Sequence, residues 1–320
     1  MALRVAFLAL CWAGAAGLEA GRPARLRFDK LSASTFRHPL DLDLTQAVQG
    51  LPLAGFVESA LRRSAAPLEQ TLRLDLLSNA LRVSEAQLPD VHALLIEACA
   101  ILDVEKIPEL YVQSSPQANA YTLGLQGETP FVVVTSALLD KCTPEETRAV
   151  IGHELGHLKC EHSVWLTIAG LAADLPLVGS TSRSIVQRWR LAAELTCDRA
   201  ALLVAQDSTV VAGALLKLVA GTGVDRLLSA EAFMQQSLDY EAALEKANPL
   251  VRLTLRSQDQ RRTHPLPVKR VTELDRWSKT PQFQKILATG SPLSLNAGAE
   301  APKVAAPQMV TAWKTKPANA

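Results

Sequence analysis

The segment AVIGHELGHLKCEH concentrates side chains that can bind a metal or carry a proton, namely His153, Glu154, His157, Cys160, Glu161 and His162. His153 and His157 are four residues apart. On a helix this spacing places both side chains on one face, with Cβ atoms about 5–6 Å apart. Two ring nitrogens can then reach one ion at the zinc–nitrogen distance of about 2.0–2.1 Å. The spacing predicts a metal site.

The neighbours of the two histidines have different expected roles. Glu154 lies beside the metal position, where a general base can take a proton from a water on the metal. Cys160 follows His157 by three residues, lies nearly on the same face, and stays an alternative ligand. His162 lies five residues after His157, about 140° round a continuous helix. We therefore expect His162, like Glu161, to point away from the metal.

A third protein ligand has to come from elsewhere, because a catalytic zinc has three protein ligands and one open position. The segment RWRLAAELTCDRAALLVAQ places Glu194 among leucine and alanine residues, where an unpaired charge is costly. Asp198 lies four residues later on the same helix face. Glu194 can bind zinc while Asp198 accepts the second N–H of a ligating histidine. The alternative is an ordinary surface pair with Arg190 or Arg199.

The elements that must position these groups are mostly helical. Thr143 to Glu146 supply an N-cap threonine, a first-turn proline and a capping-box glutamate, which predicts a helix from Pro144 to about His162. Apolar periodicity predicts further helices, at about 68–81, 88–102, 184–205, 208–220, 225–246 and 268–287. Short runs between 108 and 140 predict two or three strands, with a turn region at 124–130.

Composition limits the class of protein. With 320 residues and 48% hydrophobic content, the chain can form one sizeable core. A net charge of +1 gives no indication of a nucleic-acid partner. The five cysteines are odd in number and scattered, so they predict no disulfide framework.

Four regions are expected along the chain. Residues 1–28 read as a targeting or signal-like segment, compatible with either a secretory signal or a transit sequence. Residues 29–66 form an N-terminal extension, 67–289 the catalytic domain, and 290–320 a disordered tail rich in alanine and proline. The apolar segment Ser163–Ser180 has two interpretations. It is a buried hairpin or lid, or it is a patch that dips into lipid without spanning it.

Four short segments together resemble one protein family. HELGH followed by AAELTCDRAA looks like the HtpX-like and CAAX-prenyl-protease family of gluzincin metallopeptidases. QANAYTLG is similar to the strand that precedes the zinc helix in that family, and THPLPVKR to the segment that follows its second helix. The resemblance covers about residues 90–285 and implies a mainly α fold with a small β-sheet (α+β). Its core would hold an active-site helix, an edge-strand sheet and a second ligand helix.

The resemblance also implies roles for the metal-site residues. His153, His157 and Glu194 match the ligands of one Zn²⁺ per chain. Glu154 matches the catalytic base, and Asp198 matches the acid behind the ligands.

Three further positions are implied in the same way. His264 matches a catalytic histidine that stabilises the oxyanion, and Asn119 and Arg270 match substrate-binding positions. Pro265 and Pro267, which both follow His264, make a rigid turn that can present its imidazole. Arg270 has a structural alternative, in which it pairs with Asp198 or with the neighbours of Glu154.

These observations predict a zinc metalloendopeptidase that hydrolyses protein or peptide substrates. The HtpX-type members carry several membrane spans, whereas this chain is more similar to the small plant and algal plastid members. We therefore expect a chloroplast location at a membrane, plastoglobule or other lipid surface, with a secretory or endomembrane location as the alternative. The rival function is a lipid-associated, non-catalytic protein whose zinc site is structural and closed by Cys160 or Cys197. The sequence sets no oligomeric state.

Overall fold

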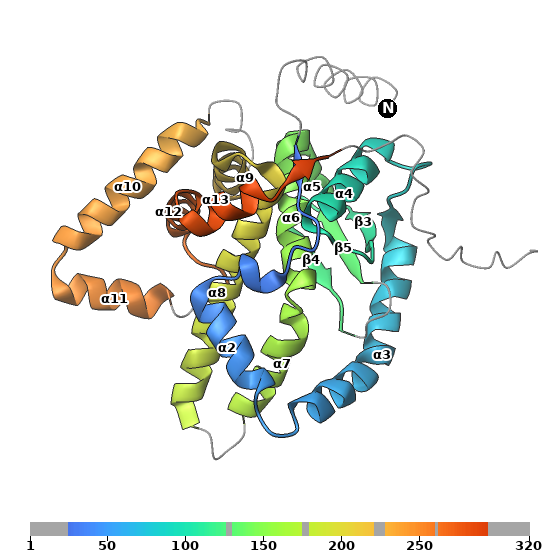
Figure 1. Cartoon of the computed structure of the whole chain (residues 1–320), viewed down its shortest axis with the longest axis horizontal. Helices are drawn as coiled ribbons and strands as arrows, with labels where there is room; N and C mark the ends of the chain where they lie inside the picture. The colour runs from blue at the N-terminus through green and yellow to red at the C-terminus, as the bar shows by residue number, and fades with distance from the viewer. Residues whose placement is uncertain (1–24, 126–129, 175–178, 221–227, 260–261, 294–320) are drawn as a thin grey trace, which may run out of the picture.

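Two long helices form the centre of the molecule (Figure 1). They are α6 (Pro144–Lys159) and α8 (Gly179–Ala205), which pack against each other and carry the two metal-site segments. The fold is mainly helical with small sheets, as the sequence predicts. The structure is a computed structural model and describes residues 25–125, 130–174, 179–220, 228–259 and 262–293.

Helix α6 begins where the sequence predicts and ends earlier. The Thr143 hydroxyl accepts a hydrogen bond from the Glu146 amide at 3.3 Å, and the Glu146 carboxylate accepts one from the Thr143 amide at 2.7 Å, which completes the capping box. The predicted continuation to His162 is wrong. Glu161 adopts a left-handed conformation with φ 52°, so α6 stops and α7 (His162–Ala173) starts in a new direction.

Small residues allow α6 and α8 to approach closely. A Cβ added at Gly152 would lie 2.8 Å from the Val204 side chain. One added at Gly156 would lie 2.9 Å from the Ala200 Cβ and 3.1 Å from the Cys197 Cα. All three distances are shorter than carbon–carbon contact allows, so the two glycines of this helix set the separation of α6 and α8.

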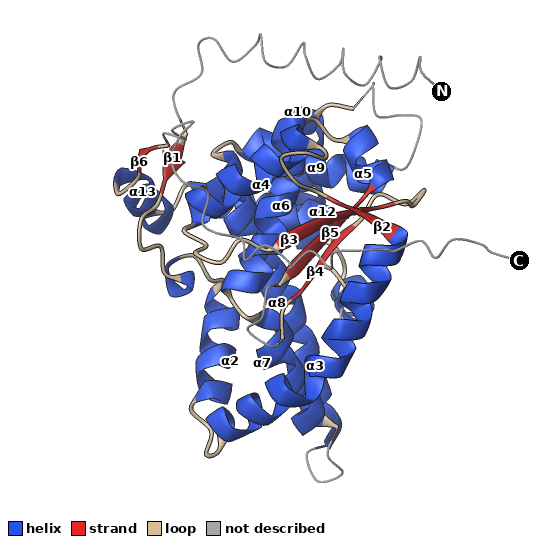
Figure 2. Cartoon of the chain, turned by 90° about the vertical axis from the view of Figure 1, so that its right-hand side faces the viewer, coloured by secondary structure: helices blue, strands red, loops and turns tan. Residues whose placement is uncertain are grey.

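A four-stranded sheet lies beside this helix pair (Figure 2). Its order is β2 (Ala80–Arg82), β3 (Glu109–Gln113), β5 (Phe131–Thr135) and β4 (Ala120–Leu123). Strands β3 and β5 are parallel, and β4 pairs with β5 in antiparallel register. Strand β4 is therefore an edge strand, and it contacts α6.

Both faces of the sheet are covered. Val132 and Val134 point into the main core, which α4 (Pro89–Leu102), α6 and α8 also build. Phe131 and Val133 form a second cluster with Leu76 of α3 (Ala54–Asn79). Because α3 covers the outer face of a sheet whose inner face meets α6, the sheet is fixed relative to the metal-site helix.

The apolar helix α7 lies inside the fold. Its Val164, Trp165 and Ile168 pack in a cluster with Trp189 of α8. This agrees with the first interpretation of the segment, a buried element, while residues 175–178 lie outside the described part. None of the helices described in the structure is long and apolar enough to cross a membrane.

The N-terminal part is built into the same core. Strand β1 (Leu26–Arg27) pairs with β6 (Ser291–Pro292), and Phe28 is buried in the main core. The short 3-10 helix η1 (Ala33–Thr35) and α2 (Pro39–Gln49) follow. The expected boundary between residues 66 and 67 falls inside α3, and most of the expected segments 1–28 and 290–320 lies outside the described residues.

Six more helices complete the described chain, and the C-terminal ones partly differ from the expectation. They are α5 (Ser136–Lys141), α9 (Ser208–Ala220), α10 (Ala230–Lys246), α11 (Pro249–Asp259), α12 (Pro267–Ser278) and α13 (Pro281–Ala288). Helix α11 was not among the predicted helices, and none of its residues is buried. The single helix expected at 268–287 is two, because Thr280 caps a new helix that starts at Pro281.

The close approach of α6 and α8 predicts the effect of Gly156→Ala. The new methyl group would overlap Ala200 and Cys197, so we expect the free energy of unfolding to fall by about 1–3 kcal/mol. The matched control is Gly55→Ala in α3, where nothing lies within 4 Å of the added Cβ. That variant should gain about 0.5–1 kcal/mol. Urea unfolding followed by circular dichroism measures both, and equal stability of the two variants would contradict the packing argument.

Candidate metal centre and active site

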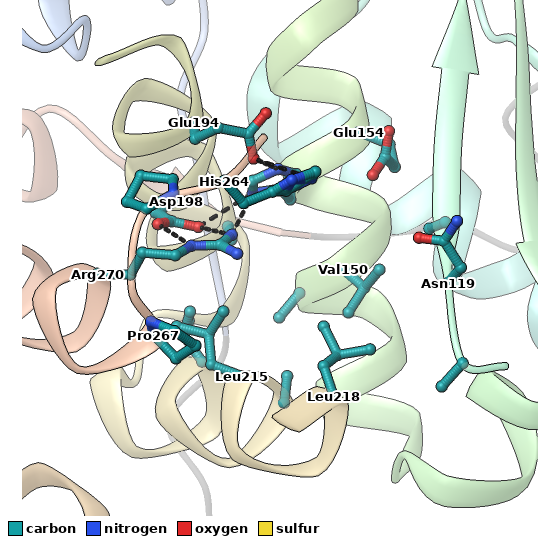
Figure 3. Close-up of a pocket in the computed structure, with 18 of the residues that line it drawn as sticks. Asn119, Val150, Glu154, Glu194, Asp198, Leu215, Leu218, His264, Pro267 and Arg270 are labelled. Carbon is teal, nitrogen blue, oxygen red and sulfur yellow. Dashed lines mark hydrogen bonds and ion pairs between the residues drawn. The ribbon is translucent and has the colours of Figure 1, made fainter. Parts of the chain in front are cut away.

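Three side chains from α6 and α8 converge on one point. The Nε2 atom of His153 lies 3.5 Å from one Glu194 carboxylate oxygen, and the Nε2 atom of His157 lies 3.5 Å from the other. The structure thus brings Glu194, which lies far from the motif in sequence, to the nitrogens of both histidines. Figure 3 shows Glu194 near His264 and Asp198 at this place.

A buried ion pair holds the far edge of the His153 ring. The Asp198 carboxylate lies 3.1 Å from His153 Nδ1. Arg270 of α12 donates two hydrogen bonds to the same carboxylate, at 2.8 and 2.6 Å (Figure 3). With Nδ1 occupied in this way, the Nε2 atom of His153 is the one left to face Glu194. The guanidinium of Arg270 is thereby engaged with Asp198, while its substrate-binding role stays a prediction.

The charges of the site favour a cation between the ligand atoms. Burial by itself would lower the pKa of His153, but the neighbouring carboxylates of Asp198 and Glu194 raise the pKa to about 10. Burial opposes the ionisation of Glu194, yet the two histidines hold its pKa well below the usual range. One Glu194 oxygen, Oε2, is buried without a hydrogen-bond partner among the described residues. A divalent metal would supply the missing positive partner, so this donor set fits a metal site.

Cys197 is also close to the two histidines but is a poorer ligand than Glu194. Ligand atoms of His153, His157 and Cys197 lie within 4.8 Å of one another. The Cys197 sulfur, however, lies 3.6 Å from Nδ1 of His162, on the side of the histidines away from Glu194. Burial raises the pKa of Cys197 well above its usual value, and that of Cys160 to about 12. Because the thiolate is the ligand form, both cysteines favour a structural role.

His162 lies next to Nδ1 of His157, a contact that the helical projection did not predict. The expectation assumed one continuous helix, whereas the turn at Glu161 swings His162 back towards α6. The two Nδ1 atoms lie 3.1 Å apart. The other His162 nitrogen, Nε2, lies 3.1 Å from the Asp41 carboxylate, which comes from α2 and is fully buried. No signal in the sequence motif identified Asp41, because it lies 121 residues before His162.

A cavity of about 640 Å³ opens beside the convergence point. Glu154 and Asn119 face each other across it, the one on α6 and the other just before β4 (Figure 3). Burial raises the pKa of Glu154 above the usual glutamate value, which strengthens it as a proton acceptor. The floor of the cavity is apolar and includes Leu138, Ala149, Val150, Val211, Ala214, Leu215 and Leu218.

His264 lies at the open side of this cavity. Its Nε2 atom is 3.7 Å from the Glu194 carboxylate, and its side chain is 59% exposed. Partial burial lowers the pKa of His264, which favours the neutral imidazole with its one N–H. The turn that contains Pro265 and Pro267 holds this ring over the same space as Glu194 (Figure 3).

Comparison with known proteins gives a family match over most of the helical core. The model of peptidase family M48 matches residues 85–278. A chloroplast protein of Arabidopsis thaliana, named plastoglobule-localized metallopeptidase 48, is 41% identical over 271 residues, which cover 82% of this chain and 77% of the relative.

More distant relatives match over shorter stretches. Protease HtpX homolog 2 of Methanosarcina mazei is 36% identical over 93 residues, which cover 29% of this chain and 31% of that protein. Among solved structures, Ste24p of S. mikatae superposes with a TM-score of 0.42 at 17% identity, covering 74% of this chain and 61% of that one.

The Asp198–Arg270 pair predicts a large stability effect. Arg270→Ala would leave the Asp198 carboxylate buried without its cation, and we expect a loss of about 3–5 kcal/mol in the free energy of unfolding. The matched control is Arg276→Ala in the same helix, whose guanidinium is 63% exposed and pairs with Glu241 at 2.6 Å. An exposed pair contributes about 0–1 kcal/mol. Denaturant unfolding with a chelator present measures both, and similar losses would contradict a special role for the buried pair.

Proposed function

The chain belongs to peptidase family M48, and on that premise we propose that it is a zinc-dependent endopeptidase acting on protein or peptide substrates. Membership makes it a metallopeptidase. The observation that carries the finer proposal is the convergence of His153, His157 and Glu194 beside a cavity that also contains Glu154. Two neutral imidazoles and one carboxylate are a common zinc ligand set in hydrolases, and they leave one coordination position open.

The proposed chemistry divides between the metal and the chain. Zinc, when bound, would polarise the peptide carbonyl and make water a better nucleophile. Glu154 accepts the proton of the attacking water and passes it to the leaving amine. His264 donates its N–H to the oxygen on which negative charge develops. Asp198 and Arg270 hold the His153 ring in place while the proton moves.

The edge strand offers a binding place for an extended peptide. Among the described strands, β4 pairs only with β5, and its first residue, Ala120, lines the cavity with Asn119. A substrate that adds to this edge would use main-chain hydrogen bonds, which are independent of sequence. The apolar floor, with Val150 and Leu215, favours a substrate that places an apolar side chain there.

The rival, non-catalytic interpretation has less support. A structural zinc site would need a fourth protein ligand, and the thiols of Cys160 and Cys197 are both buried with raised pKa values. The buried Glu154 and the open cavity also have no purpose in a closed structural site.

The mechanism predicts a specific result for Glu154→Gln. The amide cannot take a proton, so the rate of cleavage should fall by at least about 10²–10⁴-fold. The zinc content should stay that of the wild type. Cleavage of a casein-type protein and of a peptide with central leucine and phenylalanine is measured beside metal analysis. The control His153→Ala should lose both zinc and activity, and full activity of Glu154→Gln would disprove the assigned base.

We further propose that the protein works at a chloroplast lipid surface, which the name of the Arabidopsis relative supports. A group of exposed apolar side chains lies at the turn between α2 and α3. Leu51, Leu53 and Phe56 are 55%, 73% and 68% exposed there, and Val57 lies beside them. Burying such side chains in lipid gives about 1.5–3 kcal/mol each, which is enough for reversible attachment.

This proposal predicts that the double variant Leu53→Asp/Phe56→Asp detaches from lipid. We expect at least a tenfold weaker association with triacylglycerol droplets coated with phosphatidylcholine, measured by flotation, while peptide cleavage in solution is retained. The control Leu238→Asp changes an apolar side chain on α10 that is 47% exposed, and it should float like the wild type. Equal flotation of all three proteins would rule out this turn as the attachment site.

A further inference from the structure

A second chain of polar contacts lies behind the candidate metal centre, on the side of His157. The first chain runs from His153 Nδ1 to Asp198 at 3.1 Å. The second runs from His157 Nδ1 to His162 Nδ1 at 3.1 Å, and from His162 Nε2 to Asp41 at 3.1 Å. Each candidate histidine ligand thus reaches a buried carboxylate, directly in one case and through another imidazole in the other.

Proton positions along the second chain follow from its geometry. Two facing Nδ1 atoms can form a hydrogen bond only if one carries a proton and the other does not. The Nε2 atom of His157 faces Glu194 and must be free of a proton to bind a metal. The proton of His157 therefore lies on Nδ1 and is donated to His162. A neutral His162 then carries its own proton on Nε2, which is the atom that faces the Asp41 carboxylate.

We propose that His162 and Asp41 are positioning residues that fix the orientation and the proton of His157 as a metal ligand. This inference rests on the proposed zinc site. A hydrogen-bonded partner behind a ligating histidine fixes its tautomer and raises its strength as a ligand. Here the His162 imidazole is the partner of His157, and it connects His157 to the Asp41 carboxylate, which does not contact His157 directly.

Asp41 is built as a fixed anchor. Its carboxylate accepts hydrogen bonds from Trp189 Nε1 at 2.8 Å and from the Thr196 hydroxyl at 2.7 Å. Arg37 pairs with it at 3.1 and 3.2 Å, and also donates to the Cys160 carbonyl at the end of α6 at 2.5 Å. The negative charge is therefore compensated within a dry interior, and it cannot turn away from His162 without leaving several donors unpaired.

The left-handed residue Glu161 makes the contact possible. With φ at 52° it ends α6 and begins α7, so His162 returns to the Nδ1 side of His157. The His162 side chain is only 2% exposed, so bulk solvent does not compete for either nitrogen. The placement of His162, its burial and the directions of its hydrogen bonds all fit the role of positioning His157.

The test measures metal binding rather than activity alone. His162→Phe keeps a ring of similar size but removes both hydrogen bonds, while His162→Asn restores an acceptor near His157. We expect the affinity for Zn²⁺, measured by competition with a chromophoric chelator, to fall about 10–100-fold in the first variant and to recover in part in the second. The visible absorption spectrum of bound Co²⁺ should also change, and it should change more in His162→Phe than in His162→Asn. Glu146→Gln, which weakens the start of α6, is the control and should keep the wild-type affinity.

The outcomes separate this inference from the function on which it rests. A wild-type protein that binds no zinc would overturn the proposed function. A wild-type protein that binds zinc, with unchanged affinity in whichever folded His162 variant is obtained, would overturn the inference alone. A measurement that needs no variant is the ¹⁵N spectrum of the zinc-loaded wild type. A His162 proton on Nδ1 instead of Nε2 would also overturn the inference.

Discussion

The separation between α6 and α8 is the constraint on which the site depends. Two rings from one helix can meet one carboxylate from the other only if the backbones come close, and Gly152 and Gly156 allow this. The same contact places the Glu194 carboxylate, whose side chain is only 11% exposed, against the two histidines at the edge of the cavity. The packing of the two helices and the chemistry of the site are therefore linked. The close contact that buries the core also brings the Glu194 carboxylate to the two imidazoles, where a cation would compensate its buried negative charge.

Two arginine–aspartate pairs balance the polar groups behind the site. Arg270 faces Asp198, and Arg37 faces Asp41, with both carboxylates almost fully buried. Buried ion pairs of this kind stabilise little when compared with apolar packing. Their value lies in geometry, because each holds the rear edge of the site rigid. The two arginines come from opposite ends of the described chain, so the site is complete only when both ends have folded onto the central helices.

Local signals predicted much of this arrangement. The capping box at Thr143, the helical spacing of the histidines and the charge buried at Glu194 each identify a feature within one or two helical turns. The sequence could not predict His162, because a single left-handed residue, Glu161, overturns the helical projection. The role of Asp41 could not be predicted from the sequence for another reason. It meets its partners only through tertiary packing, in a region that the sequence suggested to be an extension outside the catalytic domain.

The pairing of β1 with β6 ties the two ends of the described chain together. Leu26 and Arg27 bind the strand at Ser291 and Pro292, and Phe28 fills the core beside them. A break in the backbone after Phe28 would therefore separate α2, which carries Asp41, from the strand and the core residue that precede it. The support of the metal site thus depends on a strand pair at the edge of the fold, far along the chain from the metal-binding motif.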